Sequence, residues 1–312
     1  MRIIIKSILF LVLAVSGSVV AHGQTDWRSE IGVFRVGLQT GDQRSIALAR
    51  AEPFRIALEE ALEMEVEFYP GRNTQSLIDA LQSDRIEYAI LSSSAYGLAW
   101  TLCECVEPIA IPRSRDNEDS YHAIIISRTS SSQSIKSLEG KVVAELAPGS
   151  LSQSLMVRYL IGKEGIKAET IDFRAMESSE ETLKAFAEGQ FDALVGWSSL
   201  SGSKEEGYSR GTLKRLAFRN QGSATDFRVI WKSPPIPHPP HVIRKSVPVD
   251  AKKHLISLLA GLFDNNPLAY DSVEPILGGG FGKTEHRSFE GLIDFVTAKS
   301  GVTDSTDNSA QN

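Results

Sequence analysis

The sequence predicts an α/β protein made of two domains of ordinary size. The first observation is its length, because 312 residues exceed what one typical domain contains. The second is a repeated order, in which an apolar, strand-like run leads into a polar turn and then into a helix-like segment. The third is that this order restarts near the middle of the chain. Strands that alternate with helices are typical of parallel sheets, so we expect one parallel sheet in each half.

The first half contains three such units. Three runs have the composition of strands: residues 33–38 (VFRVGL), 66–70 (VEFYP) and 87–91 (EYAIL). A helix is expected over residues 53–62, where Pro53 suits the first turn. A second helix is expected over residues 74–82, with Asn73 or Thr74 at its start. The serines that follow the third strand lead into another helical stretch.

The second half repeats the pattern. Its strand-like runs are residues 122–127, 170–176 and 191–197, and residues 134–146 contain a short helix followed by a strand. Helices are expected over residues 151–161 and 181–189, the latter opened by the capping pattern Ser178-x-x-Glu181. Residues 226–245 are interpreted as two strands joined through prolines. A helical region at 250–263 and a last helix at 288–298 complete the expected fold.

The N-terminus has the pattern of a cleavable signal peptide. Residues 1–23 contain two basic residues, then an apolar run, then small residues, with cleavage expected before Gln24. A membrane anchor is the alternative, but Ser16, Gly17 and Ser18 interrupt the apolar run before it reaches a spanning length. We therefore expect an exported protein, and a disordered tail over residues 299–312.

Composition and charge exclude several functional classes. The formal net charge of the whole chain is −6. Nucleic acids and anionic membranes attract clustered Lys and Arg, so neither is expected as the main partner. The histidines and cysteines do not form a recognisable Ser-His-Asp, Cys-His or metal-binding set, so we expect no enzyme activity, no cofactor and no metal. Cys103 and Cys105 are separated by one residue, and the spacing leaves both a disulfide and two free thiols open.

Two further motifs are interpreted as structural. Residues 277–284 (LGGGFGKT) approximate a phosphate-binding loop, but Leu277 stands where that motif needs glycine, and we interpret the segment as a flexible glycine turn. His238 and His241 flank two prolines. They could hold a metal, but a rigid, exposed connector is the preferred interpretation.

Residues 145–155 (ELAPGSLSQSL) bring small hydrogen-bonding groups to the start of a helix. Ser150 and Gln153 fit the S-x-x-Q capping pattern. The first turn of a helix also has unpaired N–H groups and the positive end of its dipole, which together favour an anion. Both a structural cap and an anion site fit this segment.

Four stretches resemble one protein family. They are DFRVIWKSPPIPHPPHVIRK (226–245), YHAIIISR (121–128), SIKSLEGKVVA followed by APGSLSQ (134–153), and AFAEGQFDAL (185–194). They are similar to the phosphate/phosphite/phosphonate-binding periplasmic components of ABC importers, the PhnD-like family. This resemblance implies a type II periplasmic-binding fold, with two lobes that close on a ligand. It also implies two crossing segments, near residues 121–127 and 224–232.

The resemblance implies a division of the chain and a set of ligand-binding residues. Residues 24–122 and 225–298 would form lobe 1, and residues 123–224 would form lobe 2. By alignment to the family, the site residues would be Thr74, Leu91, Ser92, Ser93, Tyr121, Ser150, Leu151, Ser152, Ser179 and Trp197. Family members that bind aminoalkylphosphonates hold the ammonium group of the ligand with carboxylate side chains. This sequence has no corresponding carboxylates around Trp197 and Ser198.

The resemblance also implies a function. The protein would be a periplasmic solute-binding protein, a monomer that captures a small oxyanion and delivers it to the permease of an ABC importer. One alternative is a sensor subunit that presents its ligand to a membrane receptor. A periplasmic enzyme on the same fold is the other alternative, although it lacks an identifiable nucleophile or base.

Overall fold

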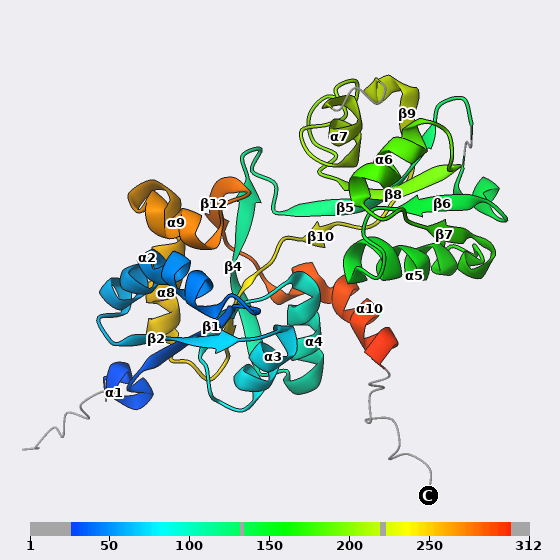
Figure 1. The fold of residues 1–312 in the computed structure, drawn as a ribbon. Coiled ribbons are helices and arrows are strands. Elements are labelled where there is room, and N and C mark those ends of the chain that lie inside the picture. The colour runs from blue at the N-terminus through cyan, green and yellow to red at the C-terminus, as the bar shows by residue number, and fades with distance from the viewer. Residues whose placement is uncertain (1–25, 132–133, 219–222, 301–312) are drawn as a thin grey trace, which may run out of the picture.

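A computed structural model describes residues 26–131, 134–218 and 223–300. These residues form two lobes, each with a β-sheet covered by helices (Figure 1). The expected signal peptide lies outside the described residues, as does the expected tail beyond residue 300. The expected start of the tail at residue 299 is wrong, because the last helix continues to Ser300. In the described part of the chain, no helix combines the length and apolarity that crossing a membrane requires.

The first sheet contains strands from both ends of the chain. Its strand order is β12 (Gly278–Gly282), β4 (Val106–Ser114), β11 (His241–Arg244), β3 (Tyr88–Ile90), β1 (Phe34–Gln39), β2 (Val66–Gly71). The strands β1, β2 and β3 are parallel, as expected. The strand β11 runs antiparallel to both β3 and β4, and β12 runs antiparallel to β4. The expectation of an entirely parallel sheet is therefore wrong, because it missed β4 and β12.

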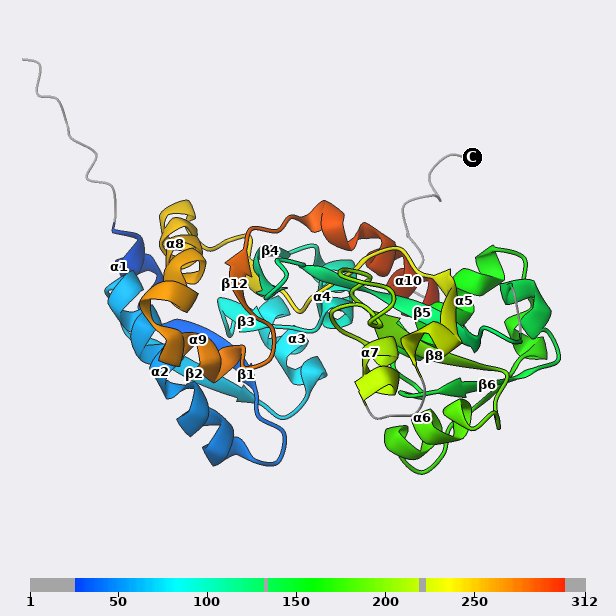
Figure 2. The ribbon, with the colours of Figure 1, turned by 90° about the horizontal axis from the view of Figure 1, so that it is seen from above.

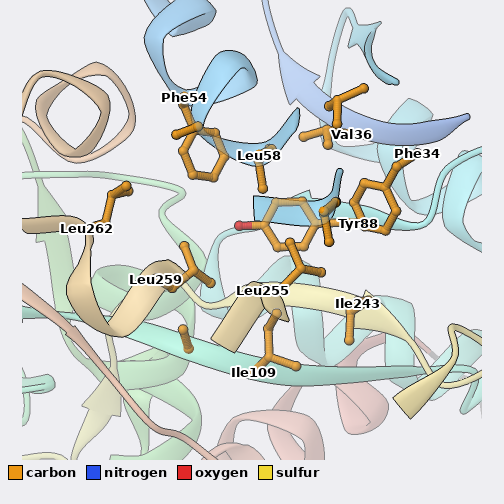
Figure 3. Packing of buried hydrophobic residues seen from close by; sticks show 14 of the residues in the cluster. Phe34, Val36, Phe54, Leu58, Tyr88, Ile109, Ile243, Leu255, Leu259 and Leu262 are labelled. Atoms are coloured by element: carbon orange, nitrogen blue, oxygen red, sulfur yellow. The ribbon is translucent and has the colours of Figure 1, made fainter. Parts of the chain in front are cut away.

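Helices cover both faces of the first sheet. They are α1 (Trp27–Ile31), α2 (Arg44–Leu62), α3 (Thr74–Gln82), α4 (Ser93–Cys103), α8 (Val249–Asn265), α9 (Pro267–Val273), the 3-10 helix η5 (His286–Phe289) and α10 (Glu290–Ser300). In Figure 3, Phe54 and Leu58 of α2 and Leu255 and Leu259 of α8 pack around Tyr88 of β3. The helices α3 and α4 pack on the opposite face.

Helix α2 begins at Arg44, well before the expected start at Pro53. Proline inside a helix removes one backbone hydrogen bond and is normally costly. Ala47, Ala51 and Phe54 are nevertheless buried along one face of α2. Tertiary packing of this face supports the helix through Pro53, which a reading of local signals could not foresee.

The second sheet is also mixed. Its strand order is β10 (Ile236–Pro237), β5 (Ser120–Arg128), β8 (Ala193–Ser198), β6 (Val142–Glu145), β7 (Asp172–Arg174), and β9 (Phe227–Lys232) pairs with β5. The helical segments of this lobe are η1 (Ile135–Leu138), the π-helical η2 (Leu151–Leu155), α5 (Met156–Lys163), η3 (Ala168–Thr170), α6 (Ser179–Ala187), α7 (Thr212–Phe218) and η4 (Ala224–Asp226). The strands β6, β7 and β8 are parallel, whereas β5 is antiparallel to β8 and β9.

The expected crossing segments lie inside the second sheet. Residues 121–127 belong to β5, and residues 227–232 form β9, which pairs with β5. Ile124, Ile125 and Ile126 are all fully buried, because helices cover both faces of this sheet. A continuously apolar run of this kind is typical of a strand buried on both faces. The chain instead passes between the sheets at residues 115–119, before β5, and at 238–240, after β10.

Helix α10 provides a further contact between the lobes. Phe289, just before α10, and Ile293 belong to a hydrophobic cluster of the first lobe. Leu292 and Phe295 belong to a cluster of the second lobe, where the Phe295 ring lies 5.3 Å from that of Tyr159. Figures 1 and 2 show α10 between the lobes, close to α4 and α5. The last helix is therefore part of two hydrophobic cores.

Three local interpretations are resolved by the structure. Cys103 and Cys105 form a disulfide at the end of α4. The expected glycine turn is wrong, because Gly278–Gly282 form strand β12. A Cβ on Gly279 would lie 2.0 Å from the carbonyl oxygen of Ser114, so only glycine allows β12 to approach β4 here.

The histidine connector is not exposed, which contradicts the sequence interpretation. His238 is hydrogen-bonded through Nδ1 to the carbonyl oxygen of Pro112 at 3.0 Å, and it is buried. His241 is also buried and is hydrogen-bonded through Nδ1 to the Tyr88 hydroxyl. The described residues contain no group of three or more potential ligands able to hold a metal ion.

Candidate functional site

Two helix N-termini converge at the carboxyl end of the parallel strands of the first sheet. Helix α3 follows β2, and its N-cap residue is Asn73, whose side chain accepts a hydrogen bond from the N–H of Ser76 at 3.0 Å. Helix α4 follows β3, and its N-cap residue is Ser92, which accepts from the N–H of Ala95 at 3.2 Å. Both helices place the positive ends of their dipoles at this edge of the sheet.

A pocket of about 580 Å³ lies at these two N-termini. Its lining residues are Gln39, Asn73, Thr74, Gln75, Ile78, Ser92, Ser94, Ala95, Leu98, Val296 and Lys299. Neutral hydroxyl and amide groups form one part of this lining, and aliphatic side chains form another. The structure thus brings together Thr74 and Ser92, two of the residues predicted from the sequence.

Gln39 is a pocket residue that the sequence reasoning missed. The Thr74 hydroxyl donates a hydrogen bond of 3.1 Å to the side-chain oxygen of Gln39, the last residue of β1. The signal was available, because Gln39 directly follows the strand expected at residues 33–38. In a parallel sheet, ligands collect beyond the carboxyl ends of the strands.

Leu91 and Ser93 lie beside the pocket but do not line it. Leu91 is buried in the hydrophobic cluster of the first lobe. Ser93 is also buried, and its hydroxyl donates a hydrogen bond of 2.6 Å to the carbonyl oxygen of Pro237. That carbonyl ends β10, so the Ser93 hydroxyl links α4 to the second sheet.

The second lobe carries a separate group of predicted residues. Ser150 follows Gly149, whose φ of +76° completes the turn after β6. The Ser150 hydroxyl accepts a hydrogen bond from the N–H of Gln153 at 3.3 Å, which confirms the predicted cap. Leu151 and Ser152 begin the π-helical segment η2, and their side chains lie outside the described part of the structure. Single π-helical turns are common at functional sites.

A buried carboxylate holds this segment in place. Glu145, the last residue of β6, is 3% exposed. Its two oxygens accept hydrogen bonds from the hydroxyl of Ser154 at 2.9 Å and from Nη2 of Arg158 at 2.6 Å. The charge of Glu145 is therefore compensated within the lobe, and its contacts tie η2 and α5 to the end of the strand.

Ser179 is the first residue of α6, directly after its N-cap Ser178. The Ser178 hydroxyl accepts a hydrogen bond from the N–H of Glu181 at 3.2 Å, as the capping pattern predicted. Ser179 is partly exposed. It follows β7, whereas Ser150 follows β6, so the two serines lie beyond neighbouring parallel strands.

Tyr121 and Trp197 belong to an aromatic group next to the crossings. Their rings are 5.9 Å apart and nearly perpendicular, and Tyr121 lies nearly parallel to the ring of His238 at 6.1 Å. The guanidinium of Arg210 lies over the Trp197 ring, with its central carbon 5.9 Å from the ring centroid. Burial lowers the pKa of His238, although its hydrogen bond to the carbonyl of Pro112 acts in the opposite direction. The net effect favours the neutral imidazole.

The predicted residues thus form two sets on different lobes. Thr74 and Ser92 line the pocket of the first lobe, and no side chain from the second sheet is among its lining residues. A direct link between the two sides exists near the crossings, where the hydroxyl of Ser201 donates a hydrogen bond of 2.6 Å to Glu118. Whether one ligand contacts both sets depends on the spacing of the lobes.

Comparison with known proteins identifies the same family over most of the chain. Residues 40–276 match a family model described as "ABC transporter, phosphonate, periplasmic substrate-binding protein". The matched region extends from the residue after β1 to the segment before β12, and it contains both groups of predicted residues.

Solved structures share the fold at low sequence identity. A Xanthomonas citri protein bound to a chloride ion is 14% identical, with a TM-score of 0.60, and the match covers 87% of this chain and 99% of that one. PhnD1 from Prochlorococcus marinus in complex with methylphosphonate is 16% identical, with a TM-score of 0.53, covering 88% and 100%. A binding protein component of an ABC phosphonate transporter from Pseudomonas aeruginosa is 17% identical, with a TM-score of 0.51, covering 89% and 90%.

Proposed function

Because this chain belongs to the family of periplasmic substrate-binding proteins of phosphonate ABC transporters, we propose that it captures a small oxyanion between its two lobes and delivers it to a membrane permease. The family's role is to bind a substrate for import, so membership implies a small ligand and a transporter in the membrane as partners. The α/β architecture of two mixed sheets agrees with the expected type II periplasmic-binding fold.

The observation that carries this proposal is the pocket at the starts of α3 and α4. Two helix N-termini, capped by Asn73 and Ser92, open into it, and Thr74 adds a hydroxyl. Backbone N–H groups at a helix N-terminus can replace the water that an oxyanion loses when it binds. Hydroxyl and amide groups add further polar contacts, so these dipoles can bind the anion without a cationic side chain such as lysine or arginine.

The apolar part of the pocket favours a ligand that carries a short carbon substituent. Ile78, Ala95 and Leu98 line the same pocket as the polar groups. An oxyanion with a short carbon substituent would place its charged head on the helix N-termini and its substituent against these side chains. Phosphonates combine these two parts, and the proposal names this class of ligand.

The second lobe would complete the site when the lobes approach. We assign this role to Ser150, Ser152 and Ser179, which follow parallel strands of the second sheet, and to Tyr121 and Trp197 beside the crossings. Leu151 would add an apolar contact between the two serines, and the backbone N–H groups after Leu91 would serve the opposite side. An oxyanion then satisfies donors of both lobes only in the closed form.

We further propose how the protein reaches its partner. Residues 1–23 direct export and are removed, and the mature protein acts as a monomer in the periplasm. It binds its ligand without chemical conversion and without a cofactor. The permease would distinguish the loaded from the empty protein by the relative position of the two lobe surfaces.

Thermal unfolding in the presence of candidate anions tests this proposal. The panel is phosphate, phosphite, methylphosphonate, 2-aminoethylphosphonate and sulfate, each at high concentration. A ligand at 100 times its Kd stabilises the folded state by about 2.7 kcal/mol, which raises the melting temperature measurably. The substitution Thr74→Val should reduce this stabilisation, because it removes a pocket hydroxyl and keeps the side-chain shape.

The matched control is Ser83→Ala, at the opposite end of the same helix. The Ser83 hydroxyl donates to the carbonyl of Asp79 and is exposed, far along α3 from the pocket. The control should respond to the anions as the parent protein does. A parent protein whose melting temperature none of the five anions changes would contradict the proposed function.

A further inference from the structure

The last turn of α10 reaches the pocket of the first lobe. Val296 and Lys299, which are three residues apart and so lie on one face of the helix, both line it. The other residues that line it lie at strand ends or in helices α3 and α4. A contribution from the C-terminal helix was not anticipated from the sequence, and the family model that matches the chain ends before α10.

Close contacts with α4 hold this helix in place. A Cβ built on Gly97 would lie 3.5 Å from the side chain of Ile293 and 3.6 Å from that of Val296, so the two helices pack at close range. The hydroxyls of Thr101 and Thr297 are 3.2 Å apart, within hydrogen-bond distance. Phe295 is fully buried on the side of the second lobe. These contacts place Lys299 at the pocket.

Lys299 differs in kind from the other groups at this site. Among the described residues that line the pocket, Lys299 alone carries a formal charge. The hydroxyls, amides and helix N-termini there carry only partial charges, and their attraction for an anion falls off faster with distance than that of a full charge. An ammonium interacts with the full charge of the ligand, and this attraction doubles when the ligand carries two negative charges instead of one.

We infer that Lys299 determines the charge preference of the ligand site. Its ammonium makes the pocket prefer dianionic over monoanionic ligands of the same shape. This inference rests on the proposed function, because it assigns a specificity role within the proposed anion site. Helix α10 thereby has two roles, since it packs against both lobes and supplies the cation.

Calorimetric titration of two ligands of matched shape tests the inference. At mildly alkaline pH, methylphosphonate is a dianion, whereas methanesulfonate is a monoanion. We expect Lys299→Gln to lower the affinity for methylphosphonate about fivefold, as for a partly exposed ion pair. The loss for methanesulfonate should be smaller, and Lys299→Arg should restore most of the preference.

Two controls separate this role from a structural one. Lysine in the last turn of a helix also stabilises the negative end of the helix dipole, so the melting temperature of each variant without ligand is compared with that of the parent. Lys253→Gln removes one positive charge from α8, where Lys253 pairs with Asp250 at 2.8 Å, away from the pocket. This control should leave both affinities unchanged.

Each outcome decides between the proposals. If the parent binds these ligands and Lys299→Gln binds both as the parent does, the inference is wrong and the proposed function stands. Equal losses for both ligands would also overturn the inference, because charge would then not be discriminated. If none of the five anions of the thermal panel binds to the parent, the proposed function fails and the inference fails with it.

Discussion

The hydroxyl of Thr74 donates a hydrogen bond of 3.1 Å to the side-chain oxygen of Gln39, and so connects the start of α3 to the end of β1. With its oxygen engaged, the Gln39 amide presents N–H donors at the pocket. Two neighbouring strand–helix connections thus share one interaction. This pair gives the pocket a defined arrangement of donors before any ligand is present.

The substitution Gln39→Ala should weaken anion binding without affecting stability. Gln39 is exposed, so its loss leaves no buried group unpaired. One hydrogen bond contributes about 0.5–1.5 kcal/mol, which corresponds to a roughly two- to tenfold rise in Kd for methylphosphonate. Titration calorimetry measures the affinity, and Gln190→Ala in the second lobe is the control. An unchanged Kd in Gln39→Ala would remove Gln39 from the site.

Ser92 and Ser93 should respond differently to alanine, although they are adjacent. Ser92→Ala removes a helix cap that lines the pocket, so it should cost about 1 kcal/mol of stability and also weaken anion binding. Ser93→Ala leaves the carbonyl of Pro237 without its buried donor, which should cost about 1–3 kcal/mol of stability.

The affinity of the folded Ser93→Ala protein should stay close to that of the parent, because Ser93 does not line the pocket. Urea unfolding and calorimetry on both variants give the two quantities. A large loss of affinity confined to Ser93→Ala would show that its hydroxyl contacts the ligand after all.

The protein should lose stability as the pH falls below neutrality, in part through His241. Burial lowers the pKa of His241 from 6.5 to about 3. The folded state therefore keeps this imidazole neutral where the unfolded chain already binds a proton. Between about pH 6.5 and pH 3, this group alone should cost about 1.4 kcal/mol for each unit by which the pH falls.

Replacing His241 by Asn removes this titration and retains a polar partner for the buried hydroxyl of Tyr88. The free energy of unfolding in urea, measured at pH 7, 6 and 5, should fall less steeply for His241→Asn than for the parent. The lower absolute stability of the variant does not affect the comparison of slopes. His254→Gln, at an exposed position on α8, should keep the parental slope, and equal slopes in all three proteins would exclude His241 as the cause.

Ligand binding should bring the two lobes closer together. The described connections that can bend are residues 115–119 and 238–240, whereas the sheets are rigid units. Each tenfold shift toward the closed form requires about 1.4 kcal/mol of differential binding, which a few charge-assisted hydrogen bonds supply. Small-angle scattering should show a smaller radius of gyration at saturating ligand. An unchanged radius, in a protein that is open when empty, would argue against closure.

Helix α10 should limit how far the lobes move, because its buried side chains belong to both cores. The substitution Phe295→Ala removes the ring that contacts Tyr159 and should destabilise the protein by about 3–5 kcal/mol. The variant should also have a wider distribution of lobe spacings in scattering experiments. The substitution Leu268→Ala, at an exposed position on α9, should leave both the stability and the spacing as in the parent.

Features with local causes were predictable from the sequence. Each helix cap accepts a hydrogen bond from an N–H three residues later, so its sequence pattern can be recognised without knowledge of the fold. These caps are Asn73, Ser92, Ser150 and Ser178. The parallel strands β1, β2 and β3 were recognisable for a similar reason, since hydrophobic runs and polar turns are short-range signals. These features also located Thr74 and Ser92 at one edge of one sheet.

Features with distant causes were not predictable in this way. Strand β12 has a turn-like sequence, and it is a strand because β4 lies beside it and leaves no room for a Cβ at Gly279. Helix α2 extends through Pro53 because its buried face packs on the sheet. The placement of β5 and β9 in one sheet depends on pairing between segments about a hundred residues apart.

The sequence by itself determined the class of the fold, the family and the helix starts that we propose as an anion site, because periodicity, capping and motif spacing act over a few residues. Only the tertiary structure decided that Gln39 and Lys299 share one pocket with Thr74, that Ser93 bonds to Pro237, and that α10 belongs to both lobes. The reason is physical: these relationships join residues that are close only after the sheets have formed and the last helix has packed between them.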